Sequence, residues 1–197
     1  MSEQAYLVDD DPCVRDALVW LLEGAGITLT VFPSAQAFLQ QAKLDQPGFV
    51  LLDICMPEMS GLALQEILIR NEHALSIIFL TGEADVPTTS KAFKNGAFDL
   101  LEKPVDAEIL LRTIRDAQEV SRQKAQRLAK AAHLRNMLTT LTARERQIML
   151  LVLAGHPNKV IAEQLYLALR TVEIHRHNMM KKMNCDNSLQ LAQLLSN

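Results

Sequence analysis

Five side chains that could act together on a phosphate group occur in order along the N-terminal half of the chain: Asp9, Asp10, Asp53, Thr81 and Lys103. Each of them ends or follows a short apolar run that predicts a buried strand. In an open α/β sheet, ligands bind at the carboxyl ends of the strands. We therefore expect these five side chains to meet at one edge of a sheet.

The chemistry of such a cluster follows from its charges. Three carboxylates gathered at one edge repel one another and raise their own pKa values. A divalent cation removes this conflict, and Mg²⁺ is suited by two acids and a backbone carbonyl because it takes oxygen ligands and keeps several waters. Lys103 adds a compact positive charge for a phosphate oxygen. Asp53 is then free to attack phosphorus as a nucleophile, with the metal and Lys103 neutralising the developing charge.

Each residue also has a plainer explanation. Asp53 could begin a surface turn, Asp9 and Asp10 could belong to a solvated helix cap, and Thr81 could cap a helix while Lys103 lies on the surface. The order of the residues, all at predicted strand ends, is much more specific than any one of them.

The elements that must position these residues alternate between strand and helix. The central strand is expected at 49–53, between turn signals at Pro47-Gly48 and Met56-Pro57. The other expected strands are 6–8, 29–32, 77–81 and 98–101, and the helices between them are 12–24, 34–43, 61–70 and 86–95. Parallel neighbours need helical crossovers, so the pattern predicts a doubly wound, five-stranded parallel sheet.

Residues 1–120 resemble the receiver domain of two-component response regulators, a CheY-like fold. The matching motifs are Asp9-Asp10, Asp53 with Met56-Pro57-x-Met59-Ser60-Gly61, Thr81-Gly82 and Lys103-Pro104. The resemblance implies that Asp53 accepts phosphate from a sensor histidine kinase and that Asp9, Asp10, Asp53 and the carbonyl of Cys55 hold Mg²⁺. It also implies a cis Lys103-Pro104 bond and a Thr81 hydroxyl that moves onto the phosphoryl group.

Leu100 departs from the receiver pattern. Three residues before the lysine, the family usually carries a Tyr or Phe ring that turns inward on activation. Leucine has no ring to swing, so the switch is expected to depend on Thr81 and on the surface of 86–95, 98–101 and the following helix. Relatives dimerise through this surface.

The region after the last predicted strand contains no Gly or Pro from 105 to 138 and is rich in good helix formers. It predicts one long helix over about 105–137, and the alternative is a break near Val120-Ser121. The expected domains are a receiver at 1–120, a helical linker at 121–138 and a DNA-binding domain at 139–197.

Charge separates the two halves of the chain. Residues 1–120 have a net charge of -11, residues 121–138 of +5 and residues 139–197 of +3. A basic half is a candidate for contact with a polyanion. Hydrophobic content of 49% with no membrane-length apolar run, no signal-peptide pattern and three scattered cysteines favour a cytoplasmic protein without membrane contact.

The basic half predicts four short helices. Thr142 is a good N-cap with Glu145 as its capping-box partner, and Gly155 ends this first helix. The third helix, 170–183, is expected to bury Val172, Met179 and Met183 and to expose Glu173, Arg176, His177 and Lys181. Two short helices joined by a tight turn indicate a helix-turn-helix, and the alternative is a small bundle that binds protein.

Residues 139–195 resemble the LuxR-type DNA-binding domain of the NarL/FixJ regulators, closest to the FixJ-like branch. The matching motifs are Leu141-Thr142-x-Arg144-Glu145, Gly155-x-Pro157-Asn158-Lys159-x-Ile161-Ala162 and Arg170-Thr171-Val172-Glu173-x-His175-Arg176. The resemblance implies base contacts by Glu173, Ile174 and His177, and phosphate contacts by Lys159, Arg170, Thr171, Arg176 and Lys181. Relatives often have Ser at the position of Ala168, and alanine caps a helix poorly.

The favoured function is a transcription regulator, not an enzyme, in which phosphorylation of Asp53 drives formation of a homodimer that binds promoter DNA. RNA polymerase is a further candidate partner. One alternative is a phosphatase using Asp9, because a strand followed by Asp-x-Asp is similar to haloacid-dehalogenase-type phosphatases. The other is a constitutive DNA-binding protein whose receiver only mediates protein contacts.

Overall fold

The N-terminal half folds around a five-stranded parallel sheet. The computed structural model describes residues 3–44, 46–71, 73–82 and 86–196. The strands are β1 (Gln4–Val8), β2 (Thr30–Phe32), β3 (Gly48–Asp53), β4 (Ser76–Thr81) and β5 (Asp99–Glu102), in the order β2-β1-β3-β4-β5. The doubly wound sheet expected from the sequence is confirmed, and β2 is one residue shorter at its start than predicted.

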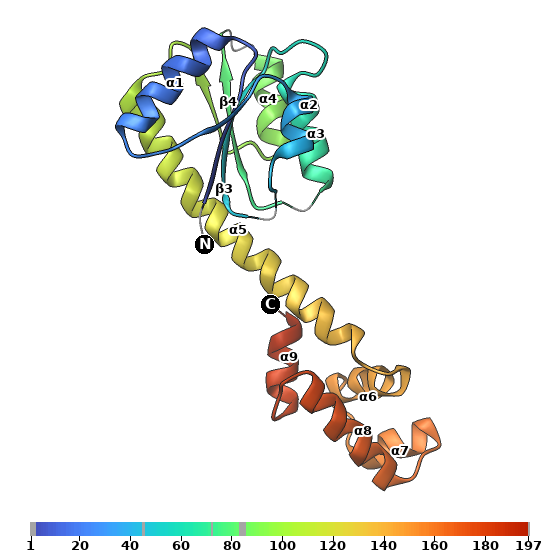
Figure 1. The fold of residues 1–197 in the computed structure, drawn as a ribbon. Helices are drawn as coiled ribbons and strands as arrows, with labels where there is room; N and C mark the ends of the chain where they lie inside the picture. The colour runs from blue at the N-terminus through green and yellow to red at the C-terminus, as the bar shows by residue number, and fades with distance from the viewer. Residues whose placement is uncertain (1–2, 45, 72, 83–85, 197) are drawn as a thin grey trace. The chain divides into compact units, whose positions relative to one another are not determined.

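Helices cover both faces of this sheet. The helices are α1 (Pro12–Gly24), α2 (Ala35–Gln41), α3 (Gly61–Arg70), α4 (Val86–Lys94) and the first part of α5 (Ala107–Thr139). Figure 1 shows α1 and α5 on one face and α2, α3 and α4 on the other. Two hydrophobic clusters fill the spaces between the layers.

The run of apolar residues in β3 is explained by this double cover. Val50 and Leu52 pack into the cluster beneath α2, α3 and α4, whereas Phe49 and Leu51 pack into the cluster beneath α1 and α5. Successive side chains of a strand point to opposite faces, so a strand covered on both sides must be apolar throughout. Asp53 is the last residue of the strand and lies at its carboxyl end.

A single helix, α5, follows the last strand, so the long helix expected over 105–137 is confirmed and the break near Val120-Ser121 is absent. Ser121 explains part of this continuity. Its buried hydroxyl donates to the carbonyl of Ala74 at 2.8 Å and accepts from the amide of Gly48 at 2.7 Å. The hydroxyl therefore holds the helix against the starts of β3 and β4 instead of ending it. The chain divides into two compact units, Met1–Leu128 and Ala129–Asn197, which we call the receiver unit and the helical unit.

The helical unit contains α6 (Ala143–Leu153), α7 (Asn158–Leu165), α8 (Leu169–Lys182) and α9 (Ser188–Ser196) after the end of α5. The capping box predicted at Thr142 and Glu145 is present, with the two reciprocal hydrogen bonds at 3.2 and 2.8 Å. Val172, Met179 and Met183 are buried in one core, as expected. None of the described helices combines the length and the apolarity that a bilayer-spanning helix needs.

Candidate functional site

The receiver unit brings three of the predicted residues into direct contact. The ammonium nitrogen of Lys103, just after β5, lies 2.6 Å from Oδ2 of Asp9 and 2.5 Å from Oδ1 of Asp53. Asp9 is fully buried and Asp53 is 5% exposed. One lysine therefore links two buried carboxylates at the carboxyl ends of β1 and β3.

Local backbone structure places both acids. The amide of Asp11 donates to Oδ1 of Asp9 at 2.9 Å, and the guanidinium of Arg15 donates to the carbonyl of Asp9 at 2.8 Å. Gly61 begins α3 directly beside Asp53, and a Cβ there would lie 2.2 Å from the Asp53 carbonyl oxygen. Only glycine therefore allows this helix to begin so close to the end of β3.

Burial governs the electrostatics of the site. Burial raises the pKa of Asp53 above its ordinary value, and the hydrogen bond and charge of Lys103 offset part of the rise. Burial acts to lower the pKa of Lys103, but its hydrogen bonds to Asp53 and Asp9 outweigh this and raise that pKa. The lysine is thus held charged while the carboxyl of Asp53 is made more basic than a surface aspartate, which favours its use as a nucleophile.

The remaining predicted residues, Thr81, Asp10 and Cys55, lie at or just after the carboxyl ends of β4, β1 and β3. Thr81 ends β4 and is buried, and its carbonyl accepts from the amide of Lys103 at 2.7 Å. The Lys103-Pro104 bond is cis, as the resemblance implied. Asp10 is exposed and takes part in neither ion pair of Lys103, and Cys55 is exposed in the loop after β3.

Leu100 is half-buried on β5 and packs against the hydrophobic cluster beneath α2, α3 and α4. The side chain at the expected switch position is therefore part of the core contacts of this structure. Sequence reasoning identified the departure from an aromatic ring but did not predict this packing.

The acid pair fits a hard divalent cation in kind, because carboxylate oxygens are the ligands that Mg²⁺ prefers. Asp9 and Asp53 both lie within hydrogen-bonding distance of one ammonium nitrogen, so their oxygens are close together. Over the described residues, no three or more His, Cys, Asp or Glu side chains converge as a cation site. Of the described acids, Asp9 and Asp53 are therefore the pair that could hold a metal at this edge.

The second candidate surface is the outer side of α8. Its exposed residues from the prediction are Arg170, Glu173, Ile174, His177 and Lys181, while Thr171 is half-buried and Lys159 is exposed on α7. Polar and basic side chains on one face of a short helix suit insertion into a DNA groove. The predicted base-contacting residues therefore share one accessible helix face.

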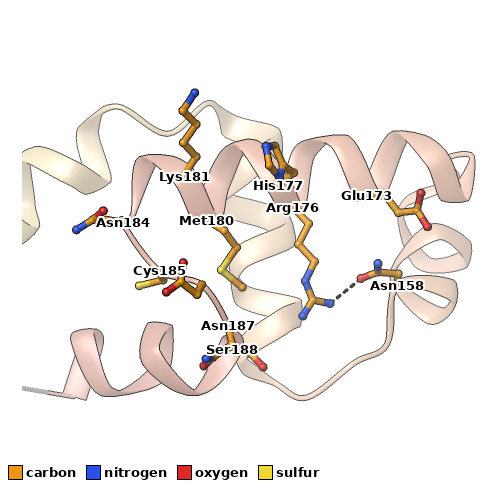
Figure 2. A pocket seen from close by; sticks show the side chains of 11 residues that line it. Asn158, Glu173, Arg176, His177, Met180, Lys181, Asn184, Cys185, Asn187 and Ser188 are labelled. Carbon is orange, nitrogen blue, oxygen red and sulfur yellow. Dashed lines mark hydrogen bonds between the residues drawn. The ribbon is translucent and has the colours of Figure 1, made fainter.

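Arg176 is less exposed than the sequence analysis predicts. It is half-buried, and its guanidinium donates to the side-chain carbonyl of Asn158 at 2.6 Å, as the dashed line in Figure 2 shows. The hydrogen bond ties α8 to the first residue of α7. Sequence reasoning missed this pair because its partners are 18 residues apart and no local pattern links them.

A groove of about 630 Å³ runs along α8 to the turn before α9. Glu173, Arg176, His177 and Lys181 line it on the α8 side, and Asn187 is among the residues on the opposite side. The groove thus collects four of the eight residues predicted to contact DNA.

The start of α8 has no side-chain cap. Ala168 occupies the N-cap position in an extended conformation, and its carbonyl accepts from the amides of Thr171 and Val172. The poor cap expected from alanine is present, and no Thr171 side-chain bond replaces it.

Glu145 has a partner that the sequence did not reveal. This glutamate is buried, and the ammonium of Lys182 donates to its Oε2 at 2.7 Å and to the carbonyl of Thr140 at 3.1 Å. Burial acts to raise the pKa of Glu145, but the hydrogen bonds from Lys182 and Thr142 lower it overall. The capping-box pattern indicated Glu145, whereas Lys182 lies 37 residues further along the chain.

Comparison with known proteins matches both units to one group of regulators. Residues 5–115 match the response regulator receiver domain, and residues 139–195 match the bacterial regulatory proteins of the luxR family. The chain is 36% identical to the response regulator protein TodT of Pseudomonas putida over 98% of this chain and 87% of TodT. It is also 36% identical to the transcriptional regulatory protein FixJ of Bradyrhizobium diazoefficiens over 96% and 92% of the two chains. The solved structure of the response regulator StyR superposes with a TM-score of 0.86, at 36% identity over 100% and 99% of the two chains.

Proposed function

Because this chain belongs to the NarL/FixJ-type response regulators, with a receiver and a LuxR-type DNA-binding domain, we propose that phosphorylation of Asp53 by a sensor histidine kinase controls its binding to promoter DNA. Regulators of this family act in transcription within two-component systems. The proposed domain limits are a receiver at 1–120, a helical linker at 121–138 and the DNA-binding domain at 139–197. A promoter as partner also favours the cytoplasm as its location.

The observation that carries the proposal is the ion-pair cluster of Lys103 with Asp9 and Asp53. Asp53 is the acid at the end of the central strand, its pKa is raised by burial, and the half-buried ammonium of Lys103 lies within hydrogen-bonding distance. A phosphoryl group on Asp53 adds negative charge and acceptor oxygens beside that cation. Lys103 can then exchange one carboxylate partner for the phosphoryl oxygens without losing its countercharge.

Receiver domains of this family generally use Mg²⁺. We assign its ligands to Asp9, Asp10, Asp53 and the carbonyl of Cys55, and the bound ion would neutralise charge on the transferred group. Lys103 holds the phosphoryl oxygens, and the Thr81 hydroxyl, at the neighbouring strand end, supplies a further donor. Leu100, already packed in the core, leaves Thr81 as the residue whose movement reports the phosphorylated state.

The output proposed for this switch is a homodimer formed through α4, β5 and the start of α5. Large apolar side chains are exposed on this surface, at Val86, Phe93 and Ile109.

A two-fold dimer presents two α8 helices to a two-fold DNA site. In each α8, Glu173, Ile174 and His177 would contact bases. The phosphate contacts are assigned to Lys159, Arg170, Thr171, Arg176 and Lys181. Contact with RNA polymerase would follow on the promoter.

The proposal is tested by mass spectrometry of the intact protein incubated with acetyl phosphate and Mg²⁺. We expect one phosphoryl adduct in the wild type and in Asp116→Asn, an exposed charge-matched control on α5, and none in Asp53→Asn. Footprinting and sedimentation with beryllofluoride should show protected operator DNA and a dimer for the wild type and for Asp116→Asn, and neither for Asp53→Asn. An adduct that persists in Asp53→Asn would show that the phosphoacceptor is assigned to the wrong residue.

A further inference from the structure

Tyr166 ends α7 in a backbone conformation that glycine adopts far more readily. Its φ of 54° and ψ of 48° lie in the left-handed region, and its amide donates to the carbonyls of Ala162 and Glu163, which closes the last turn of the helix. A side chain in this region is crowded by its own backbone, and a bulky residue there is unusual. The turn between α7 and α8 therefore needs a left-handed residue, and the chain supplies a tyrosine where glycine would be unstrained.

Packing within the chain does not explain why a tyrosine is kept at this position. Tyr166 is 95% exposed, so its ring lies almost entirely in water. Two other described residues besides glycine have a positive φ: Asn184 is of a type that tolerates the left-handed region, and Glu58 accepts a hydrogen bond of 2.9 Å from the side chain of Gln36. A large aromatic ring left in water on a strained backbone indicates contact with another molecule.

The neighbours of Tyr166 along the chain identify that molecule as DNA. Ala168 is the N-cap of α8, and the side chain of Arg170, in the first turn of α8, is largely exposed. In a helix-turn-helix, the start of the recognition helix contacts the DNA, so a ring two residues before the N-cap lies at the edge of that contact. The turn is thus continuous with the exposed face of α8 that is proposed to bind DNA.

We propose that Tyr166 contacts the DNA backbone, with its hydroxyl donating to a phosphate oxygen beside the groove that α8 enters. Tyrosine is one of the side chains that contact DNA phosphates, and a phosphate contact carries no sequence information. Tyr166 would therefore orient α8 on the duplex without selecting bases. The hydrogen-bonded turn holds its backbone in place before DNA arrives, so binding orders little additional chain. This contact rests on the proposed DNA-binding role of α8.

Two substitutions test the hydroxyl and the ring separately, with fluorescence anisotropy of a short duplex of mixed sequence. Tyr166→Phe keeps the ring and removes the donor, so the Kd should rise roughly fivefold to tenfold. Tyr166→Gly removes the ring and relieves the left-handed backbone, so the Kd should rise at least as much while the urea midpoint of unfolding does not fall. Unchanged Kd values for both variants would overturn the proposal.

The salt dependence of binding distinguishes a direct contact from a displaced helix. A neutral hydroxyl releases no counterion, so Tyr166→Phe should shift the plot of log Kd against log salt concentration without changing its slope. Arg170→Ala, which removes a charge in the first turn of α8, should reduce the slope by about one. A reduced slope for Tyr166→Phe would show that the substitution moves the basic residues of α8 away from the DNA, and it would overturn the direct contact.

Nuclear magnetic resonance of the wild type supplies a readout that does not depend on how a variant folds. The chain has two tyrosines, so selective ¹³C labelling gives one ring signal from Tyr166 and one from Tyr6, which is buried in the receiver core. Added duplex should shift the signal of Tyr166 and leave that of Tyr6 unchanged. A duplex that binds without moving the Tyr166 signal would overturn this contact alone. A duplex that does not bind the wild type at all would overturn the proposed DNA-binding function, and the Tyr166 contact with it.

Discussion

The receiver unit and the helical unit keep their functional charges in opposite environments. Asp9, Asp53 and Lys103 form their ion pairs largely out of contact with water. On α8, Arg170 and Glu173 face solvent, and their nearest charged atoms are 3.6 Å apart. A receiver must hold a reactive carboxyl in a controlled state. A DNA-binding surface must instead leave its charges free to contact DNA.

This difference determines how strongly each set of charges is coupled to folding. Removing one partner of a buried ion pair leaves an uncompensated charge and costs about 3–5 kcal/mol, whereas an exposed pair contributes about 0–1 kcal/mol. The receiver site is therefore tied to the stability of its unit. The α8 surface can change with little effect on folding, which suits a surface that must differ between operators.

The largest expected effect is that of Lys103→Met. The substitution leaves Asp9 and Asp53 buried without their cation, so we expect the free energy of unfolding of the receiver unit to fall by about 3 kcal/mol at pH 7. Urea denaturation with and without Mg²⁺ measures the effect, and added Mg²⁺ should restore part of the loss.

Lys91→Met is the matched control for this experiment. Lys91 pairs with Glu66 at 2.9 Å, but both side chains are about half exposed. The loss there should stay below about 1 kcal/mol. If the two variants lower the free energy of unfolding equally, burial of the charges is not what ties the receiver site to the stability of its unit.

Much of the receiver site could be predicted from the sequence because the information is local. Asp53 follows four apolar residues and precedes a turn, Thr81 likewise ends its strand, and Lys103 directly follows the last strand. Parallel strands bring these ends to one edge, so their proximity follows from topology alone. The long α5 was predictable for a similar reason, since neither Gly nor Pro interrupts 105–138.

The pairs that sequence reasoning missed depend on contacts between distant segments. Ser121 reaches Gly48 and Ala74 only because α5 packs across the starts of β3 and β4. Lys182 meets Glu145 only once α8 has packed on α6. Neither partner carries a local signal, because a serine or a lysine in a helix is ordinarily a solvated residue. Burial and pairing over long separations are what the structure adds.

We expect the buried His73 to make the stability of the receiver unit depend on pH. Its pKa of about 4 in the folded state lies below the ordinary 6.5, so the unfolded chain takes up a proton at a higher pH than the folded chain does. The free energy of unfolding should therefore fall as the pH drops from 6.5 towards 4, by about 2 kcal/mol after allowance for partial solvent screening. His73→Phe should remove this part of the pH dependence in urea denaturation.

The control is His133→Phe, at an exposed position on α5. It should leave the slope between pH 4 and 6.5 as in the wild type. A His73→Phe variant that keeps the full slope would show that other groups cause the acid sensitivity of the receiver unit.

Glu145 is the exception in the helical unit, since its charge is buried as in the receiver. Glu145→Gln keeps an acceptor for the Thr142 amide but removes the charge opposite Lys182, so we expect a loss of about 1.5 kcal/mol in thermal or urea unfolding. Glu163→Gln, an exposed change of the same kind on α7, should have no measurable effect. A similarly small effect of both substitutions would show that the charge of Glu145 contributes no more to stability than the exposed charges of the helical unit.

The smallest expected effect is a gain from Ala168→Ser. Ala168 stands at the N-cap of α8 without a side-chain hydrogen bond, and its extended backbone already has the conformation that a capping serine adopts. A serine hydroxyl there can accept from the first free amides of α8, so the free energy of unfolding of the helical unit should rise by about 0.5–1 kcal/mol. Ala154→Ser, at the carboxyl end of α6, is the control, because a hydroxyl there meets no free amides.

If Ala168→Ser also tightens DNA binding at equal salt, the uncapped start of α8 is a part of the DNA surface that orders on binding. If stability rises and affinity does not, the first turn is already formed, and the exposed charges of α8 are independent of the stability of the helix that carries them.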